Sequence, residues 1–469
     1  MRKYILLSVM LLVASLSYVG AYAAEKPATS EAALVLNCTE INTNAYINKE
    51  MVYIPIRAAG EALGYKVGWK LEDGASLVPL TKSNDEVVLN LTYDRVNDNG
   101  HSYFVYSYAD SDPFVIYEGK AYIEAGLFSD VFGYNTDYDN QSKQVTLSKI
   151  NENTINIQNQ SKHEEQGNLT IDLQYPQIQG MKNTDIQTKL NELFKSAAMD
   201  AENEVIRNSK ELGDIGSGKY AADFNYRIRY NQNDLLSLNT YDYQYAGGAH
   251  GSTIENSYTI NLKTGEILNL SDLLNKDSHY TEYINSVIRS EIDKKVAIGE
   301  LAEIATFKTI GDKPAFYLSN GSLVFYFQQY EYFPYAAGLQ EFNIPFVNIK
   351  DKLVKEYSVL YREPVQLKTG VENYLPVGNL GKVTLKGNPT TGYSWHYVVA
   401  DSTILCESSQ SYVADSTASG IVGSGGTYNW EFRALKSGKT TITFKYYREW
   451  EGESSATSDN TVVYNVTVQ

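Results

Sequence analysis

Histidine and cysteine, two residue types that often act in catalysis or bind metals, are few in this chain and widely spaced. Five histidines are present, and none of them comes at the spacing of a metal site: His101, His163, His250, His279 and His396. His250 lies in the glycine-rich turn GGAHG, where a lone histidine without a partnered nucleophile is more often structural than catalytic. Neither a nucleophile elbow nor a phosphate loop is recognisable. We therefore expect no enzyme, no catalytic residue, no bound metal and no cofactor.

The segment GNPTTGY, residues 387–393, favours contact with a partner instead. Pro389 fixes its own φ, Asn388 can hydrogen-bond forward into the turn, and Gly392 permits a positive φ before the chain continues. A loop of this composition is expected to be stiff before it meets anything.

Two further segments follow this loop in the sequence. GSGG, residues 423–426, has three glycines, whose missing side chains let a partner approach the backbone closely. YREW, residues 447–450, places a large aromatic ring beside a guanidinium. Each is weak evidence alone, because glycine and serine clusters are ordinary linkers. Their order behind the distinctive GNPTTGY segment argues against coincidence.

Short strands must position these three loops. The region from about Pro364 to Gln469 contains KVTLK, YSWHYVV, TYNWEFRAL, TTITFKYYREW and TVVYNVTVQ, most of which alternate apolar with polar residues. Roughly a hundred residues of such strands, joined by glycine and serine turns, predict an immunoglobulin-like β-sandwich whose loops gather at its two ends. Trp395 and Trp430 are expected between the two sheets.

The order Asn-Pro-Thr-Thr-Gly-aromatic, Gly-x-Gly-Gly and Arg-x-Trp resembles the pattern of the chagasin family, protein inhibitors of papain-like cysteine peptidases. The resemblance covers essentially all of residues 364–469 and implies a wedge of three adjacent loops that plugs the active-site cleft. It implies that the threonines of the first loop lie over the catalytic cysteine and histidine of the peptidase. The glycines of the second loop would lay backbone along the substrate-binding strand, and the third loop would cover the primed side. The implied contact residues are Asn388, Pro389, Thr390, Thr391, Gly392, Tyr393, Gly423, Gly425, Gly426, Arg448 and Trp450.

One residue departs from the family pattern. Glu449 stands between Arg448 and Trp450, where the family usually has proline. The loss of that ring makes the third loop less preorganised and adds a negative charge near the contact, so a lower affinity or a shifted selectivity is expected. Inhibition itself needs no chemistry from the loops, because a plug has only to reach the nucleophile without offering a scissile bond in the attack geometry.

The first region, residues 33–150, contains an internal repeat. MVYIPIRAAGEALGYKVGWK is echoed by KAYIEAGLFSDVFGYNTDYD, and each copy predicts a strand, a one-sided helix, a stop at Gly64 or Gly133, and another strand. This α+β pattern resembles the domain named after the N-terminus of copper amine oxidases. The chain has no Asn-Tyr-Asp/Glu site for a tyrosine-derived quinone, so we expect a wall-associated binding or spacer role and no copper chemistry.

The middle region, residues 169–355, follows a polar linker and combines helices with strands, which predicts a second α+β domain. Apolar residues recur at helical spacing over 186–205 and 283–292, the first run behind the capping candidates Thr184 and Asp185.

Two glycine-ended aromatic segments of this region, YAGGAHGSTIENSYTINLKTGEILNLSDL and YEYFPYAAGLQEFNIPF, resemble a domain of lysozyme-sensing anti-sigma factors. A similar domain precedes the catalytic domain of some peptidoglycan deacetylases. The resemblance implies a binding surface for a protein or a wall glycan. Its tyrosines could form a stacking platform, whereas period-two alternation would place about half of them in the core. They are Tyr241, Tyr243, Tyr245, Tyr330, Tyr332 and Tyr335.

The N-terminus has the features of an export signal. Two bases precede an apolar run over residues 4–19, and the small residues of Ala21-Tyr22-Ala23 predict cleavage after Ala23, giving a signal peptide over residues 1–23. A membrane anchor is the alternative, but the run is short for a span. We expect a secreted or cell-wall-associated protein without a transmembrane anchor after cleavage.

Net charge bears on the class of partner, and cysteine content bears on how the fold is stabilised. The formal charge is −16, and it becomes −18 once the two bases of the leader are removed, which argues against nucleic acid as a partner. Cys38 and Cys406 are the only cysteines and lie far apart in the sequence, so no disulfide framework is expected and stability should come from packed cores.

Two functions of different classes follow from these patterns. The first is inhibition of a papain-like cysteine peptidase, of the organism itself or of a host, by the C-terminal domain of a secreted bacterial protein. The alternative is a surface protein that binds cell-wall glycan or a lysozyme-like protein, with the sandwich as a passive spacer.

Overall fold

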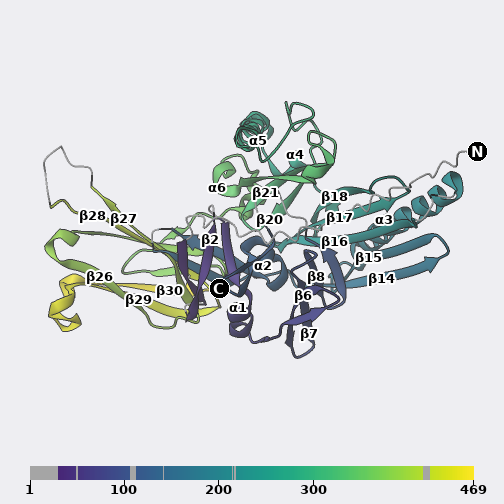
Figure 1. The fold of residues 1–469 in the computed structure, drawn as a ribbon. Helices are drawn as coiled ribbons and strands as arrows, with labels where there is room; N and C mark the ends of the chain where they lie inside the picture. Colours follow the sequence, from purple (N-terminus) through teal and green to yellow (C-terminus); the bar gives the residue numbers. More distant parts are fainter. Residues whose placement is uncertain are drawn as a thin grey trace, which may run out of the picture.

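The computed structural model describes residues 30–37, 39–48, 51–105, 112–140, 142–213, 215, 218–415 and 423–469. The predicted leader, residues 1–23, and Cys38 lie outside this set. Six sheets and a few helices form the described chain, which is therefore multidomain and mostly β (Figure 1). The helices of the described chain are all too short or too polar to span a lipid bilayer.

Two sheets form the N-terminal part. The larger has the order β10-β11-β3-β2-β1-β13-β12, and the smaller has the order β4-β6-β7-β8-β9 with β5 beside β6. The strands of the larger sheet are β1 (Ser30–Leu36), β2 (Thr39–Asn48), β3 (Met51–Pro55), β10 (Phe114–Tyr117), β11 (Lys120–Glu124), β12 (Tyr134–Asp139) and β13 (Gln144–Lys149). Those of the smaller are β4 (Lys66–Val67), β5 (Lys70–Glu72), β6 (Ala75–Lys82), β7 (Asp85–Asn90), β8 (Arg95–Asp98) and β9 (His101–Phe104).

Both copies of the sequence repeat form a strand, a helix, a glycine and another strand. The helix α1 (Ile56–Ala62) follows β3, and α2 (Ala125–Phe132) follows β11. The chain leaves α1 through Gly64 at φ 89° and α2 through Gly133 at φ 66°, a backbone region that glycine enters without steric cost. Since β3 and β11 pair with each other, the two copies lie side by side.

A six-stranded sheet and a three-stranded sheet form the middle part. Their orders are β14-β15-β16-β17-β18-β19 and β20-β21-β22. The strands are β14 (Asn156–Gln166), β15 (Leu169–Gln179), β16 (Tyr220–Gln232), β17 (Leu235–Tyr245), β18 (Ser252–Asn261), β19 (Glu266–Ile267), β20 (Phe316–Ser319), β21 (Ser322–Phe327) and β22 (Gln340–Pro345). The helices are α3 (Thr184–Leu212), which packs on β15, β16 and β17, and α4 (Leu270–Leu273), α5 (Tyr280–Ala297) and α6 (Phe346–Ile349).

The start of α3 differs from the predicted caps. Thr184 is the first helical residue and Asp185 lies in the first turn. The cap is Asn183, whose side-chain oxygen accepts the backbone N–H of Asp185 at 3.0 Å and of Ile186 at 3.2 Å. The predicted caps are wrong because the residue before them already satisfies these otherwise unpaired donors.

The tyrosines of the middle part divide between core and surface. Tyr241 is fully buried, whereas Tyr330 is 57% exposed. The period-two alternation expected of these tyrosines does not extend through YEYFPY, since β21 stops at Phe327 and a 3₁₀ turn follows at Tyr335–Ala337. A tyrosine at φ 66°, as Tyr330 has, does not fit a strand.

Two four-stranded sheets face each other in the C-terminal part, with the orders β23-β25-β28-β27 and β24-β30-β29-β26. The strands are β23 (Val365–Gln366), β24 (Glu372–Leu375), β25 (Leu380–Gly387), β26 (Tyr393–Val399), β27 (Leu405–Ala414), β28 (Gly426–Ala434), β29 (Gly438–Arg448) and β30 (Thr461–Val468). Trp430, Phe432 and Phe444 are buried between the sheets, and the partly buried Trp395 packs against them.

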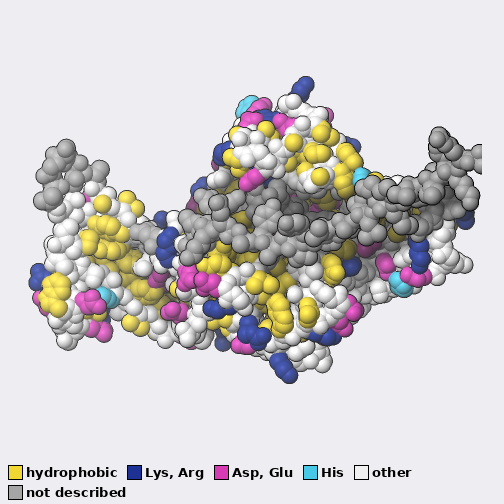
Figure 2. Space-filling model, in the orientation of Figure 1, with side chains coloured by type: hydrophobic (Ala, Val, Ile, Leu, Met, Phe, Trp, Pro, Cys, Tyr) yellow, Lys and Arg dark blue, Asp and Glu magenta, His cyan; other side chains and the backbone are white. Residues whose placement is uncertain are grey.

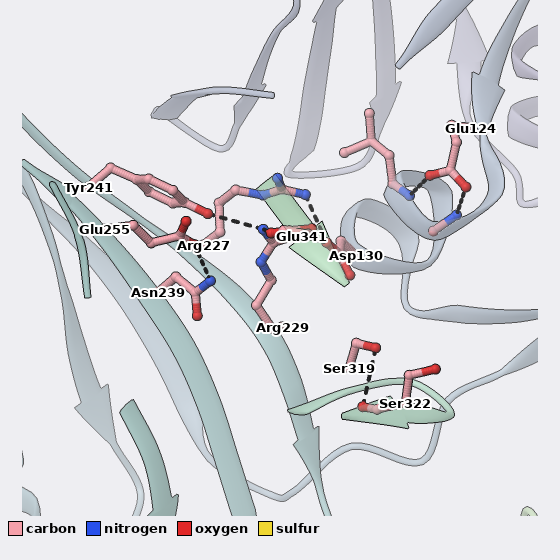
Figure 3. A network of polar contacts seen from close by, with 12 residues as sticks. Glu124, Asp130, Arg227, Arg229, Asn239, Tyr241, Glu255, Ser319, Ser322 and Glu341 are labelled. Atoms are coloured by element: carbon pink, nitrogen blue, oxygen red, sulfur yellow. Dashed lines mark hydrogen bonds and ion pairs between the residues drawn. The ribbon is translucent and has the colours of Figure 1, made fainter. Parts of the chain in front are cut away.

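A buried ionic network joins the N-terminal part to the middle part (Figure 3). Arg227 and Arg229 of β16 both donate to Asp130 of α2, at 2.9 and 3.4 Å. Arg229 also donates to Glu341 of β22 at 3.1 Å. These buried ion pairs link side chains of the two parts directly, and removing one member would leave an uncompensated buried charge.

Glu255 of β18 lies beside this network and accepts a hydrogen bond from the Asn239 amide at 2.5 Å (Figure 3). Burial raises the pKa of Glu255 to about 7, and the neighbouring Glu341 carboxylate raises it in the same direction.

The sandwich is attached to the N-terminal part by polar contacts from β12. Arg433 pairs with Asp137 at 2.6 Å, and the Gln410 N–H donates to Asp139 at 3.2 Å. Cys406 of β27 is disulfide-bonded, so a covalent link adds to the packed cores on which stability was expected to depend. The sandwich projects to one side of the molecule, and α3, β14 and β15 project to the other (Figure 1).

Candidate functional site

The first predicted loop joins β25 to β26 and is held in a 3₁₀ turn, Pro389–Thr391. The Asn388 side-chain oxygen accepts the backbone N–H of Thr390 at 3.1 Å and its hydroxyl at 2.6 Å. The Thr391 hydroxyl donates to the Asn388 carbonyl at 2.6 Å, and Gly392 ends the turn at φ 80°. These internal bonds make the turn stiff without any partner, and Thr390 and Thr391 remain exposed at its tip.

The second loop lies directly against the first. The Asn388 amide donates to the carbonyl of Gly423 at 2.8 Å, and Gly426 pairs with Gly387 across β25 and β28. A Cβ at Gly425 would stand 3.0 Å from the Gly387 carbonyl, so a side chain there would push the loops apart. Residues 416–422, which precede these glycines, lie outside the described part of the chain.

The third loop covers the other side of the first. The Arg448 guanidinium donates to the Thr391 carbonyl at 3.2 Å and lies over the Tyr393 ring at 4.6 Å. The Trp450 indole packs on Gly392, where any Cβ would overlap the ring, yet Trp450 remains 72% exposed. Glu449 follows Arg448 as the first residue of a 3₁₀ turn, Glu449–Glu451.

All three loops therefore meet at one end of the sandwich. The described members of the predicted set belong to this end, and direct contacts join the first loop to each of the other two. This end points away from the other sheets (Figure 1). This end of the sandwich carries the exposed side chains of Thr390 and Thr391, the glycine backbone of the second loop and the exposed ring of Trp450.

Tyr446 is a supporting residue that the sequence pattern did not single out. Its hydroxyl accepts the Asn388 N–H at 2.7 Å, and its ring lies 5.3 Å from Tyr393 and 4.8 Å from Trp395. Alternation along β29 places Tyr446 on the face of the buried Phe444, which is the signal that could have found it.

His250, the alternative catalytic candidate, lies far from these loops on the middle part. Its ring stacks on Tyr335 at 3.7 Å, and its Nδ1 lies 2.8 Å from the Gly251 carbonyl. Among the described residues, no group of three or more histidine, cysteine or acidic side chains is arranged to hold a metal ion.

The middle and N-terminal parts are similar to three sequence families. Residues 35–166 match the copper amine oxidase N-terminal domain, residues 162–253 match the deacetylase PdaC, and residues 271–347 match a family of unknown function, DUF3298. Anti-sigma-V factor RsiV of Bacillus subtilis is 26% identical over 203 residues, which are 41% of this chain and 68% of RsiV. These matches confirm the two resemblances stated for these regions.

The C-terminal part matches a family of inhibitors. Residues 374–468 match the chagasin family peptidase inhibitor I42. The crystal structure of the cysteine protease inhibitor EhICP2 from Entamoeba histolytica aligns with a TM-score of 0.19 and 28% identity, covering 21% of this chain and 86% of that one. Amoebiasin-1 of the same organism is 38% identical over 92 residues, which are 20% of this chain and 84% of amoebiasin-1. With such a relative matched over most of its length, this chain belongs, through its C-terminal part, to the chagasin family of peptidase inhibitors.

Proposed function

We propose that the chain is a secreted bacterial protein whose C-terminal domain, residues 364–469, inhibits papain-like cysteine peptidases by a non-covalent wedge of three loops. Family membership supports the inhibitory role. The main observation in support of a three-loop wedge is that the second and third loops both contact the first directly. Asn388 donates to the Gly423 carbonyl, and Arg448 donates to the Thr391 carbonyl.

In this proposal each loop has one task. Thr390 and Thr391 lie over the catalytic cysteine and histidine of the peptidase, and the glycines of residues 423–426 lay backbone along its substrate-binding strand. Arg448 and Trp450 cover the primed side. Tight binding then comes from loops that have little conformational entropy left to lose, since their internal hydrogen bonds are already made.

The first loop is a poor substrate for a physical reason. Its tip is a 3₁₀ turn whose threonines both bond back to Asn388, so aligning it for cleavage requires these bonds to break. An interface of about 1,600 Å² in total is sufficient, and slow release would set the potency.

The remaining regions carry binding in this proposal and no catalysis. We assign residues 33–150 to one α+β domain, residues 169–355 to a second and residues 364–469 to an immunoglobulin-like sandwich. Residues 156–166, which were expected to belong to a polar linker, pair with β15 as β14 and therefore go with the second domain. Similarity to RsiV and to the PdaC family supports an extracellular or cell-wall setting, with the peptidase belonging to the organism itself or to a host.

A second candidate function is recognition of wall glycan or a lysozyme-like protein by the middle part. It is favoured by a surface cluster in which His250 stacks on Tyr335 and Tyr330 stands exposed beside them. Flat exposed rings with polar tips suit a sugar face or a protein interface.

Titration of papain with the full chain tests the main proposal. We expect stoichiometric, reversible loss of activity, and we expect the double variant T390D/T391D to inhibit at least about 100-fold more weakly, because two unpaired charges would be buried in the cleft. The control is S402D/T403D, which adds the same charge at the connection after β26, at the opposite end of the sandwich.

Three outcomes separate the alternatives. Undiminished inhibition by T390D/T391D would show that the wedge is assigned to the wrong residues. Loss of inhibition in both double variants would point to a general effect of charge or folding. If the unmodified chain leaves papain and related peptidases active, the sandwich is a spacer, and binding of peptidoglycan fragments or lysozyme becomes the measurement of choice.

A further inference from the structure

The charges at the loop-bearing end are unbalanced. Three lysine or arginine side chains lie there, and each has an acidic partner in the same end of the sandwich. The pairs are Lys386–Asp415 at 2.9 Å, Arg448–Glu451 at 3.1 Å and Lys445–Glu453 at 2.7 Å. The positive charges of this surface are therefore compensated within it.

Two acids of the connection from β29 to β30, which contains the third loop, have no such compensation. Glu449 and Asp459 are exposed, and neither forms an ion pair with any residue that the structure describes. Acidic side chains are visible at this end of the sandwich, at the left of Figure 2. The surface around the three loops thus carries a surplus of two negative charges.

Glu449 occupies the position in the third loop where this surplus matters most. The residue before it, Arg448, donates to the Thr391 carbonyl, and the residue after it, Trp450, packs on Gly392. Glu449 is exposed between these two residues, so we place its carboxylate at the edge of the surface that a partner of the first loop would cover.

The sign of the partner's surface then decides the outcome. A carboxylate placed against an apolar or acidic surface loses its hydration without forming an ion pair, which weakens binding. A basic surface instead attracts the carboxylate during approach and forms an ion pair with it in the complex. The overall charge of −16 adds a long-range field of the same sign.

We infer that the third loop selects, among papain-like cysteine peptidases, those whose surface beside the active-site cleft is basic. The inference rests on the proposed inhibitory function. It assigns Glu449 as the specificity-determining residue, with Asp459 strengthening the same field.

The test uses the full chain, its E449Q and E449K variants, and two forms of one papain-like peptidase. The first form has lysines or arginines beside the cleft, and in the second these are replaced by glutamate. The control is E211Q, which removes one exposed acid from the last turn of α3, on the far side of the molecule. Association rates and inhibition constants are measured from about 20 to 500 mM NaCl.

For the basic peptidase, we expect E449Q to associate about three- to tenfold more slowly at low salt and E449K to be slower still, with both differences shrinking as salt is raised. For the acidic peptidase the order should reverse. E211Q should behave like the unmodified chain in every case.

Three other results would contradict the inference. If the unmodified chain inhibits but its rates and inhibition constants do not depend on the residue at position 449 or on the charge of the peptidase, the inference is overturned while the inhibitory function stands. A chain that inhibits neither form overturns the proposed function and the inference with it. Equal effects of E211Q and E449Q would show that net charge, and not the third loop, sets the selectivity.

Discussion

Gly392 meets two independent requirements at the tip of the first loop. Its φ of 80° lies in a region that disfavours any side chain, and its Cα faces the indole ring of Trp450. The first requirement concerns the shape of the turn alone, and the second concerns the contact between the first and third loops.

Comparison of the variants G392A and G452A should separate the effect of the Trp450 contact from that of backbone strain at a positive φ. We expect G392A to lower the free energy of unfolding by about 1–2 kcal/mol and to weaken inhibition at least about tenfold, because Trp450 must move off the first loop. Gly452, at φ 76° with open space around it, provides the control, since G452A carries the same strain without the overlap. Calorimetry and inhibition constants are the measurements, and comparable inhibition by both variants would contradict the expected role of the Trp450 contact.

At this scale much of the site could be predicted from the sequence. The roles of Pro389, Asn388 and Gly392 follow from local backbone preferences, and the structure shows the forward hydrogen bond and the positive φ expected of them. Asn183 was missed as a cap because Thr184 and Asp185 have equally suitable side chains, and sequence alone does not say where helical backbone begins.

At the scale of elements, the pairing of β26 with β29 holds the first and third loops in register. Tyr393 is opposite Arg448, and Trp395 is opposite Tyr446. The start of β26, which follows the first loop, therefore lies beside the end of β29, which leads into the third loop. The Tyr446 hydroxyl adds a bond to the backbone of the first loop.

The variant Y446F should loosen the first loop. Without the hydroxyl, the Asn388 N–H loses its acceptor, and we expect a loss of about 1 kcal/mol in stability and a several-fold weaker inhibition. Y447F is the control, because Tyr447 lies on the opposite face of β29 and stacks on His396. Faster amide exchange at Asn388 in Y446F, but not in Y447F, would confirm the cause. Identical exchange in the two variants would rule it out.

Strand prediction succeeded where one face of the strand is buried. β25, β26, β28, β29 and β30 were all found from their alternation. The edge strand β27, with its serine-rich sequence, was not, because an edge strand attached by backbone hydrogen bonds needs little apolar patterning.

At the scale of the whole molecule, the arrangement of the parts depends on partners distant in sequence. Arg227 and Asp130 are 97 residues apart, and the sequence around either residue gives no indication that the two form an ion pair. Period and composition describe single elements, so the resulting network became visible only in the fold.

The same network predicts how stability depends on pH. The pKa of Glu255, raised to about 7 by burial, exceeds its value in the unfolded chain, so the folded state holds this proton more tightly. Its contribution is fully present below about pH 4.5 and is lost as the pH rises through about 7.

We therefore expect the thermal midpoint of the chain to fall between pH 5 and pH 8 by more than that of the variant E255Q, which cannot ionise. The corresponding difference in the free energy of unfolding should be on the order of 1–3 kcal/mol. Comparison with E255Q is needed because burial lowers the pKa of His101 to about 3, which acts in the opposite direction by destabilising the fold as the pH falls below about 6.5. Parallel pH profiles for the two proteins would contradict the assignment.

The outward-facing position of the three loops also determines the time course of capture. The loops are held together before any encounter, and the end that bears them points away from the rest of the described chain. No opening step has to precede docking, so the observed rate of complex formation should rise linearly with inhibitor concentration and show no plateau.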